Sequence, residues 1–279
     1  TGSSGKTSTK NMIATILSQE GETCATEGNF NNEIGVPLTL LKIEAQHDFS
    51  VVEMGARSPG DIRYLSELVQ PDVAILLNAG VAHIDIFGSY ENIVEAKSEI
   101  FDHLKDGGVA IVNADDPAIN IWTKKLGNKR KLSFSVQDKS ADIYAADIKC
   151  EAESSSFSLH YQDVTLAITL PVPGLHNVSN CLAAAAAAIA VGIGFDSIKR
   201  GLAKLKSTEG RLHISKLSQD LTLIDDSYNA NPASMKASLD VLSLRSGYKV
   251  AVLGEMAELG LLSESLHVEV AKYAANTTI

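Results

Sequence analysis

Short apolar runs alternate along the chain with segments of helical periodicity, and this alternation is the feature that most constrains the fold. The runs are rich in β-branched residues and continuously apolar, as in strands that are buried on both faces of a parallel sheet. Helices then serve as the crossover connections between such strands. We therefore predict an α/β fold with a mostly parallel sheet, whose strands are Phe49–Glu53, Val73–Asn78, Val109–Asn113, Leu221–Asp225 and Val250–Leu253.

Between residues 131 and 170 the pattern changes to an alternation of apolar and polar residues. This alternation is typical of antiparallel strands with one buried face, and the polar pair Gln162-Asp163 favours a turn between them. We predict a small antiparallel sheet attached to the main one, with inward-facing residues Phe157, Leu159, Tyr161, Leu166, Ile168 and Leu170.

The first residues, TGSSGKT, have the composition of a phosphate-binding loop. Small residues let successive backbone N–H groups wrap an anion, Lys6 can reach the outer phosphates, and the Thr7 hydroxyl can take a Mg²⁺ position. Apolar residues at helical spacing follow and end at Gly21, so a helix leaves the loop directly, as this motif requires. The match covers only G-x-x-G-K-T, and a flexible linker is the alternative interpretation. The residues predicted to bind the phosphates are Thr1, Gly2, Ser3, Ser4, Gly5, Lys6 and Thr7.

The composition excludes several classes of partner. At 279 residues, with 45% hydrophobic and 21% charged residues, the chain has the make-up of a globular enzyme of two domains or one large α/β unit. Its apolar runs are shorter than the ~20 residues of a membrane helix, so we expect no membrane partner. The net charge of −10 disfavours nucleic acid, and three scattered cysteines favour a reduced, cytoplasmic protein.

Polar residues close several of the predicted strands, where ligands gather in open α/β sheets. Glu53, Asn78 and Asp225 occupy such positions. An acid at a strand end beside a phosphate-binding loop is a usual ligand of the Mg²⁺ that accompanies a nucleotide, directly or through water. A helix-capping or solvated Glu53 is the alternative.

A lysine lies on the apolar face of the helix predicted over Glu91–Leu104. Lys97 follows Ile93 by four residues and precedes Ile100 by three, so all three share one face. A buried ammonium is costly unless it is paired or loses its proton. A neutral lysine amine can also react with CO₂ to form a carbamate, an anionic oxygen ligand suited to Mg²⁺. Alternatively, Lys97 extends along the surface and keeps its charge in solvent.

Further candidates have nucleotide-binding character. His83 lies just past a strand end, where it can contact a metal or be a structural histidine. Asn177 and Asn180 are three residues apart at a helix start, so their amides can bind a purine edge, although Asn177 can also simply cap the helix. Arg211 can cover a terminal phosphate or form a surface salt bridge. A strand-end carboxylate such as that of Asp225 suits the hydroxyls of ribose.

Taken together, these segments resemble the Mur ligase family, the ATP-dependent amide-forming enzymes of peptidoglycan precursor synthesis. The matching segments follow the family order: TGSSGKT, VVEMGA, NAGVAHIDIFGS, EAKSEIF, PGLHNVSN, EGRLH and DDSYNANPAS. Within the family, GNFNNEIGVPLTLL, EMGARSPGDI, DDSYNANPASM and LGEMAELG look most like the members that add D-alanyl-D-alanine to a UDP-N-acetylmuramoyl-tripeptide.

The resemblance implies a P-loop central ATP-binding domain over residues 1–210 and the first part of a Rossmann-like C-terminal domain over residues 211–279. Both would be truncated, and the family's N-terminal UDP-binding domain would lie outside this sequence. Closure of the two domains would assemble the site, since Arg211 and Asp225 lie across the junction from Lys6. We expect a monomer.

The resemblance also implies a mechanism and a set of roles. A substrate carboxylate attacks the γ-phosphate of ATP, and an amine then displaces phosphate from the acyl phosphate. Lys6 would stabilise the transferring phosphoryl group. Two Mg²⁺ ions are implied. Thr7 and Glu53 would bind one ion, and His83 and a carbamylated Lys97 would bind the second. Asn177 and Asn180 would contact adenine, Arg211 the γ-phosphate and Asp225 the ribose. Asn31 and Asn32 would contact the UDP-linked substrate.

Two alternatives remain open from the sequence. Another ligase of the superfamily, such as a different amino-acid-adding Mur enzyme or a folylpolyglutamate synthase, would use the same chemistry on other substrates. A regulatory P-loop NTPase would turn over nucleotide without an acceptor amine and would have no need of Lys97.

Overall fold

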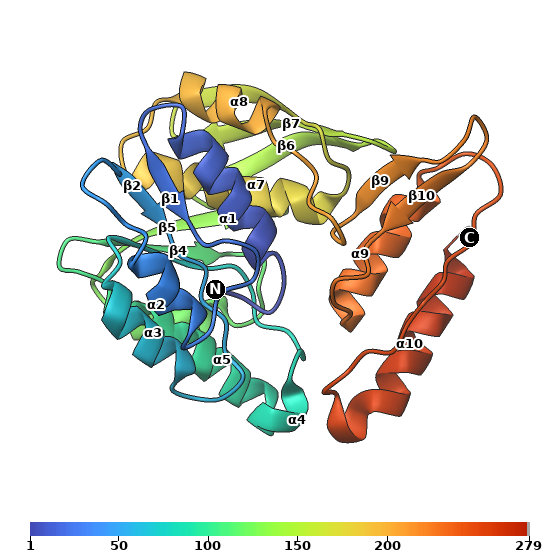
Figure 1. Cartoon of the computed structure of the whole chain (residues 1–279), viewed down its shortest axis with the longest axis horizontal. Coiled ribbons are helices and arrows are strands. Elements are labelled where there is room, and N and C mark those ends of the chain that lie inside the picture. Colours follow the sequence, from blue (N-terminus) through green and yellow to red (C-terminus); the bar gives the residue numbers. More distant parts are fainter. Residues whose placement is uncertain (278–279) are drawn as a thin grey trace.

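The computed structural model describes residues 1–277, which form a layered central part and a smaller C-terminal part beside it (Figure 1). The central part is built on a six-stranded sheet whose strands, in order across the sheet, are β3 (Val73–Leu76), β4 (Val109–Asn113), β5 (Arg130–Ser135), β6 (Ile143–Cys150), β7 (Ser155–Tyr161) and β8 (Val164–Leu170). Neighbouring strands from β3 to β6 are parallel, and β6, β7 and β8 are antiparallel. The predicted α/β class, with a mostly parallel sheet and an antiparallel extension, is confirmed.

Strand β4 explains why the run at residues 109–113 is continuously apolar. The side chains of Val109 and Ile111 belong to one hydrophobic core, and those of Ala110 and Val112 belong to another on the opposite face. Successive side chains of a strand point to opposite faces, so a strand that is covered on both sides needs apolar residues at every position.

Helices cover both faces of this sheet (Figure 1). The alanine run of α7 is fully buried, and its small side chains let the helix pack closely against the sheet and against α1. Among residues 1–277, no helix is both long and apolar enough to cross a membrane. The helices on the first face are α1 (Lys6–Leu17), α7 (Leu175–Ala190) and α8 (Phe195–Ala203), and the second core contains residues of α2 (Gly35–Leu40), α3 (Asp61–Val69), α4 (Ile84–Phe87), α5 (Tyr90–Ser98), the 3-10 helix η1 (Glu99–Phe101) and α6 (Ile119–Leu126).

Two more strands, β1 (Thr23–Ala25) and β2 (Phe49–Val51), pair in parallel and form a separate sheet. The predicted strand Phe49–Glu53 is therefore shorter than expected, and within the described residues it does not pair with the six-stranded sheet. Thr1 lies along the edge of β3, where its amino group donates to Ile75 O. A groove of about 520 Å³, lined by both polar and apolar residues, lies between β2 and β3.

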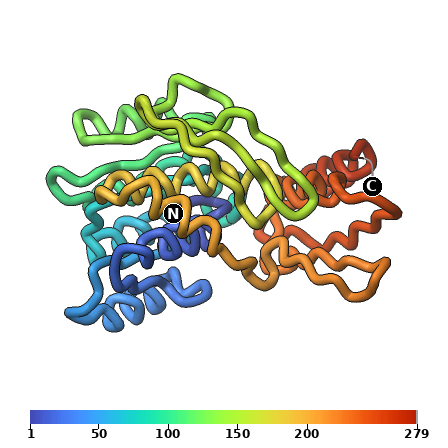
Figure 2. Tube along the Cα trace, turned by 90° about the horizontal axis from the view of Figure 1, so that it is seen from above, coloured from blue at the N-terminus to red at the C-terminus, as the bar shows by residue number. Residues whose placement is uncertain are grey.

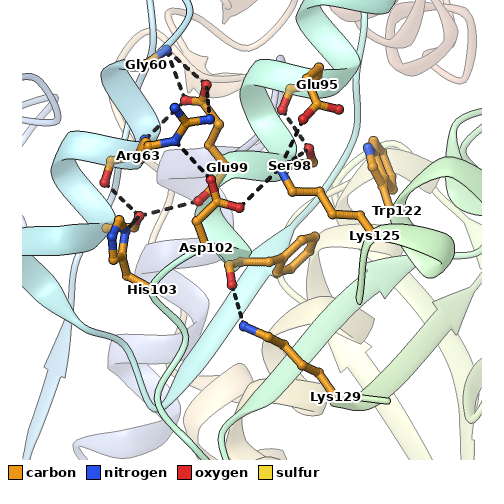
Figure 3. A network of polar contacts seen from close by, with 12 residues as sticks. Gly60, Arg63, Glu95, Ser98, Glu99, Asp102, His103, Trp122, Lys125 and Lys129 are labelled. Atoms are coloured by element: carbon orange, nitrogen blue, oxygen red, sulfur yellow. Dashed lines mark hydrogen bonds and ion pairs between the residues drawn. The ribbon is translucent and has the colours of Figure 1, made fainter. Parts of the chain in front are cut away.

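The helix predicted over Glu91–Leu104 is present as α5 followed by η1, so it ends three residues earlier than expected. The carboxylate of Glu99 lies at this end and is buried. It accepts hydrogen bonds from the backbone N–H groups of Gly60 and Arg63 at the start of α3 (Figure 3). A negative charge is stabilised at a helix N-terminus, so this network ties α5 to α3 and fixes the helix that carries Lys97.

The C-terminal part has a small core formed by Leu239, Met256, Leu259 and Val270. Seen from above, it lies beside the layered part rather than over it (Figure 2). Its elements are β9 (His213–Lys216), β10 (Thr222–Asp225), α9 (Pro232–Ser243), the 3-10 helix η2 (Gly260–Leu262) and α10 (Ser263–Asn276), with β9 and β10 antiparallel.

The strand predicted over Val250–Leu253 is not formed. In residues 1–277 this segment pairs with no other strand, and the side chain of Val252 is 93% exposed. An extended segment becomes a strand only where a neighbour satisfies its backbone groups, which the apolar pattern alone cannot reveal.

Candidate active site

The phosphate-binding loop is shaped by Gly5, which precedes helix α1 with a φ of +80°. Glycine adopts this left-handed conformation without steric cost. A Cβ placed on Gly5 would also lie 2.4 Å from Asn180 Oδ1, so there is no room for a side chain. Asn180 of α7 therefore lies directly against the loop.

Two serines of the loop are held against the end of β3. Ser4 N donates to Asn78 Oδ1 at 2.9 Å, and Asn78 Nδ2 donates back to Ser4 O at 3.2 Å. Gly80 N donates to Ser3 Oγ at 2.8 Å. The strand-end asparagine singled out in the sequence thus fixes the conformation of the loop.

Lys6 and Thr7 follow the loop and face one cavity. Lys6 Nζ donates to Gly2 O at 2.9 Å, which folds the lysine back over the loop. Burial lowers the pKa of Lys6, and the nearby Glu53 carboxylate opposes this shift. The Thr7 hydroxyl is buried and has no hydrogen-bond partner among the described residues, so it is available to a ligand.

Glu53 lies two residues beyond β2 and is buried. Its Oε1 accepts from Asn31 Nδ2 at 2.7 Å, and its backbone N–H donates to Thr26 Oγ1 at 3.0 Å. Its second oxygen, Oε2, has no hydrogen-bond partner within residues 1–277, and Lys10 Nζ lies 4.0 Å from it. One carboxylate oxygen is therefore fixed and the other is free for a cation. Asn32, the other predicted substrate contact, lines the same cavity, and its Oδ1 accepts from the backbone at the start of α2.

Lys97 is buried, as its position on the apolar face indicated, and only 2% of its surface is exposed. The alternative, that Lys97 extends along the surface and keeps its charge in solvent, is therefore wrong. Its Nζ lies 6.0 Å from the centroid of the Phe87 ring, and within residues 1–277 no carboxylate forms an ion pair with it. Burial, with a smaller contribution from Lys6, lowers the pKa of Lys97 to about 7. A large fraction of the amine is consequently neutral near neutral pH.

His83 precedes α4 with a left-handed backbone, φ +62°. Its Nδ1 contacts the Glu258 carboxylate of the C-terminal part. Asp85 N also donates to Glu258 O at 3.3 Å. His83 is thus at the cavity and at the same time forms one side of a contact between the two parts.

The C-terminal part reaches the cavity through a few residues. Arg211 lies over the ring of Tyr228, with 4.1 Å between the guanidinium carbon and the ring centroid. Asn231 Nδ2 donates to Ser4 Oγ at 3.1 Å, across 227 residues of sequence. Asp225 accepts hydrogen bonds from Ser227 and does not line the cavity, whereas the next residue, Asp226, does.

The predicted adenine contacts, Asn177 and Asn180, are both buried in α7. Asn177 Nδ2 donates to Pro173 O at 2.8 Å, and Asn180 Nδ2 lies 3.4 Å from Asn177 Oδ1. Within the described chain they therefore form a short polar chain behind the loop rather than part of the cavity wall.

A cavity of about 950 Å³ brings these groups together, a volume within the range of ligand sites in proteins. Sequence reasoning missed Asn231 and Glu258, which line this cavity, and Lys10, which lies close to Glu53. Asn231 and Glu258 could not be paired with partners so distant in the chain. Lys10, which lies behind the cavity, could have been found, because it shares the apolar face of α1 just as Lys97 shares that of α5. Of the predicted site residues, those that line the cavity are Gly2, Ser3, Ser4, Gly5, Lys6, Thr7, Asn31, Asn32, Glu53, His83, Lys97 and Arg211.

The residues fit a Mg²⁺ ion of the kind that accompanies a nucleotide. Within residues 1–277, no group of three His, Cys, Asp or Glu side chains is placed so that it could hold a metal ion. Mg²⁺ in nucleotide sites, however, usually uses one or two protein oxygens together with phosphates and water. Two of the buried oxygens that have no partner among the described residues, Thr7 Oγ1 and Glu53 Oε2, are suitable donors.

Comparison with known proteins defines the class. Residues 1–188 match the Mur ligase middle domain, and residues 210–279 match the Mur ligase, glutamate ligase domain. The chain belongs to the Mur ligase family. The domain boundary predicted between residues 210 and 211 stays a prediction, because neither match covers residues 189–209.

Three individual relatives show which members of the family the chain is similar to. The chain is 44% identical over 274 residues to UDP-N-acetylmuramoyl-tripeptide--D-alanyl-D-alanine ligase of Escherichia coli (strain K12), covering 98% of this chain and 61% of the relative. MurF from Acinetobacter baumannii matches with a TM-score of 0.96 at 39% identity, over 100% of this chain and 60% of that one. MurF ligase from Thermotoga maritima in complex with ADP matches with a TM-score of 0.89 at 32% identity, over 99% of this chain and 63% of that one. The chain thus spans about 60% of the length of these relatives.

Proposed function

We propose that this chain is the nucleotide-binding part of an ATP-dependent amide ligase, which adds D-alanyl-D-alanine to a UDP-N-acetylmuramoyl-tripeptide in peptidoglycan precursor synthesis. The observation that carries the proposal is that Lys6, Glu53, His83, Lys97 and Arg211 line one cavity. The name of the Escherichia coli relative states this activity, and the Thermotoga maritima structure contains ADP. The enzyme acts as a monomer in the cytoplasm.

In the proposed reaction, the carboxylate that ends the tripeptide attacks the γ-phosphorus of ATP, and ADP leaves. The amine of D-alanyl-D-alanine then attacks the acyl phosphate carbon, so that an amide forms while phosphate and a proton leave. Lys6 and the loop N–H groups stabilise the charge on the transferring phosphoryl group, and Arg211 approaches it from the C-terminal part.

Two Mg²⁺ ions fit the proposed site, and their chemistry is to neutralise the charge on the phosphates and on the attacking carboxylate. Thr7 and Glu53 would hold the first ion, a role supported by their unpartnered oxygens. His83 and Lys97 would hold the second, with Lys97 as the carbamate. Supporting this role, the lowered pKa of Lys97 provides the neutral amine that reacts with CO₂.

The remaining roles follow from the same proposal. Asn177 and Asn180 contact adenine, which the position of Asn180 against Gly5 supports. Asp225 contacts ribose. Asn31 and Asn32 contact the UDP-linked substrate, since both line the cavity.

The test is an assay of phosphate release from ATP, run on this chain within a protein of the full length of its relatives. With UDP-N-acetylmuramoyl-tripeptide present, D-alanyl-D-alanine should stimulate release, whereas single amino acids and glutamate should not. Equal stimulation by a single amino acid would indicate another ligase of the superfamily. Release that needs no acceptor amine would indicate a regulatory NTPase.

A further inference from the structure

Lys10 is a second buried lysine that none of the proposed catalytic roles uses. It lies one helical turn after Lys6 on α1, and only 6% of its surface is exposed. Its Nζ donates to Thr26 O at 2.7 Å and to Gly28 O at 3.2 Å. Burying a lysine is costly, so a buried lysine whose donors are aimed at two specific carbonyls indicates a defined role.

These carbonyls belong to the loop of residues 26–32, which connects β1 to α2 and which we call the Asn31 loop. Apart from Lys10, the loop is attached near Glu53 by four hydrogen bonds, one of which Thr26 N donates to Val51 O at 3.0 Å. Glu53 N donates to Thr26 Oγ1, Gly55 N donates to Asn31 O at 2.8 Å, and Asn31 Nδ2 donates to Glu53 Oε1. The residues between these attachments, including Phe30, are largely exposed.

The Lys10 side chain therefore connects helix α1, which carries it, to the Asn31 loop, and its ammonium lies close to the carboxylate of Glu53. Its distance of 4.0 Å from Glu53 Oε2 is too long for a hydrogen bond, so the carboxylate oxygen stays free while the positive charge remains close. Burial lowers the pKa of Lys10, the Glu53 carboxylate opposes this shift, and the charge of Arg211 adds to it. Because α1 begins at the phosphate-binding loop, Lys10 links that loop to the position of Asn31 and Glu53.

We propose that Lys10 is a positioning residue, which fixes the Asn31 loop on helix α1 and so holds Asn31 and Glu53 toward the phosphate-binding loop. This inference rests on the proposed function, because it assumes that Glu53 faces a Mg²⁺–nucleotide. Lys10 acts through these two residues and touches no reacting atom.

The first test measures amide hydrogen exchange of the 279-residue chain without any ligand, so it is independent of the proposed function. Lys10→Met removes the donors but keeps most of the side-chain volume. Exchange at the amides of Glu53 and Gly55, which are bonded to the Asn31 loop, should become at least ~10-fold faster by local opening. Amides of α8 should be unchanged, and Lys204→Met, which removes an exposed lysine, is the matched control. Equal acceleration at all amides, or none, would overturn the proposal.

The second test measures binding of a non-hydrolysable ATP analogue by calorimetry with and without Mg²⁺. In Lys10→Met the enhancement of affinity by Mg²⁺ should fall about 10-fold or more, since Glu53 is no longer held in place, while Mg²⁺-free affinity changes less than about 3-fold. A larger enhancement would show that Lys10 competes with the ion, and an unchanged one that Glu53 needs no such support; either result overturns the proposal. Absence of nucleotide binding in the unmodified chain would instead count against the proposed function.

If Lys10→Met does not fold, Lys10→Gln decides the question with the same measurements. The glutamine amide keeps a donor for one carbonyl but cannot satisfy both. Exchange at Glu53 and Gly55 should then increase by a smaller factor, about 3-fold, and unchanged exchange would overturn the proposal.

Discussion

In the central part, the cavity residues Lys6 and Lys97 lie on helices that pack into two extensive cores, whereas the C-terminal part reaches the cavity mostly from loops. The central helices and strands are apolar on every packed face, as β4 and α7 show. The core of the C-terminal part contains four buried apolar residues, and apolar side chains such as Val252 and Leu261 are exposed. Its contacts to the central part include Asn231 to Ser4 and Glu258 to His83.

This difference indicates that the two parts have different roles in the site. Groups that must be held at a fixed distance from a phosphate and an ion are best placed on rigid elements, while a part that reaches the site from loops can move as a unit. We therefore predict that the C-terminal part closes on a central site that is formed beforehand. The following predictions test this difference between the central and the C-terminal part.

The largest effect is expected at Lys97, a central residue. In a protein of the full length of the relatives, Lys97→Ala should lower the rate of the proposed D-alanyl-D-alanine ligation by about 1,000-fold or more, because the carbamate that would hold the second Mg²⁺ is lost. Added bicarbonate should not restore activity, since alanine cannot form a carbamate. Lys105→Ala, which removes an exposed lysine paired with Asp72, is the control and should keep the normal rate. A Lys97→Ala enzyme of normal activity would refute the proposed role.

Equivalent truncations in the two cores should differ in cost. Leu182→Ala, in α7, should lower the free energy of unfolding by about 3–4 kcal/mol, because the surrounding core cannot relax into the cavity. Leu239→Ala, in the small C-terminal core, should cost about 2 kcal/mol. Urea unfolding followed by circular dichroism measures both values. Equal costs would contradict the contrast between a rigid and a loosely packed part.

The stability effect of the buried Lys97 depends on pH with a definite sign. Since the folded pKa is lowered to about 7 from 10.5, the unfolded state binds more protons between these values, so stability rises as pH increases through this window. Lys97→Met should therefore raise the free energy of unfolding by about 2–4 kcal/mol at pH 6, and the advantage should shrink toward pH 10. Urea titrations in bicarbonate-free buffer at several pH values test this. A constant difference would show that burial does not perturb the amine.

Replacing Gly5 by alanine should lower the free energy of unfolding more than the same change at a glycine that has a similar φ and open space around it. Gly5→Ala combines a positive φ with a clash against Asn180 and should cost about 2–3 kcal/mol. Gly192→Ala also has a positive φ, +82°, but open space around the Cβ, and should cost about 1 kcal/mol. Thermal unfolding of both variants gives the comparison. Similar losses would mean that the contact with Asn180 relaxes.

The smallest effect is expected at the contact between the parts. Asn231 caps α9 by accepting from Ser234 N and also donates to Ser4. Asn231→Ala should destabilise the C-terminal part by about 1 kcal/mol, the usual value of an N-cap, and should make it more accessible to protease than the central part. The matched control is Asn229→Ala, because within residues 1–277 the Oδ1 of Asn229 accepts only from its neighbour Ala230 N. If the C-terminal part of the variant resisted protease as well as that of the unmodified chain, Asn231 would not be needed for its stability.

The sequence predicted much of the fold where the signal is local. The run at residues 109–113 is a strand buried on both faces, and the alternating segments around Gln162 form β7 and β8. The predicted strand Val250–Leu253 failed because pairing, rather than apolar character, makes a strand. The helix predicted to Leu104 ends sooner because its last turn is a 3-10 helix, held by the buried Glu99.

By itself, the sequence indicated the phosphate-binding loop, the position of Lys97 on the apolar face of its helix and the location of Glu53 and Asn78 close to strand ends, because each depends on residues that are near one another in the chain. Only the tertiary structure decided which oxygens of Thr7 and Glu53 are left without partners, and that Lys10 and Glu258 join the site. Those contacts link segments up to 175 residues apart, as between His83 and Glu258, and their geometry arises only when the helices and sheets pack together.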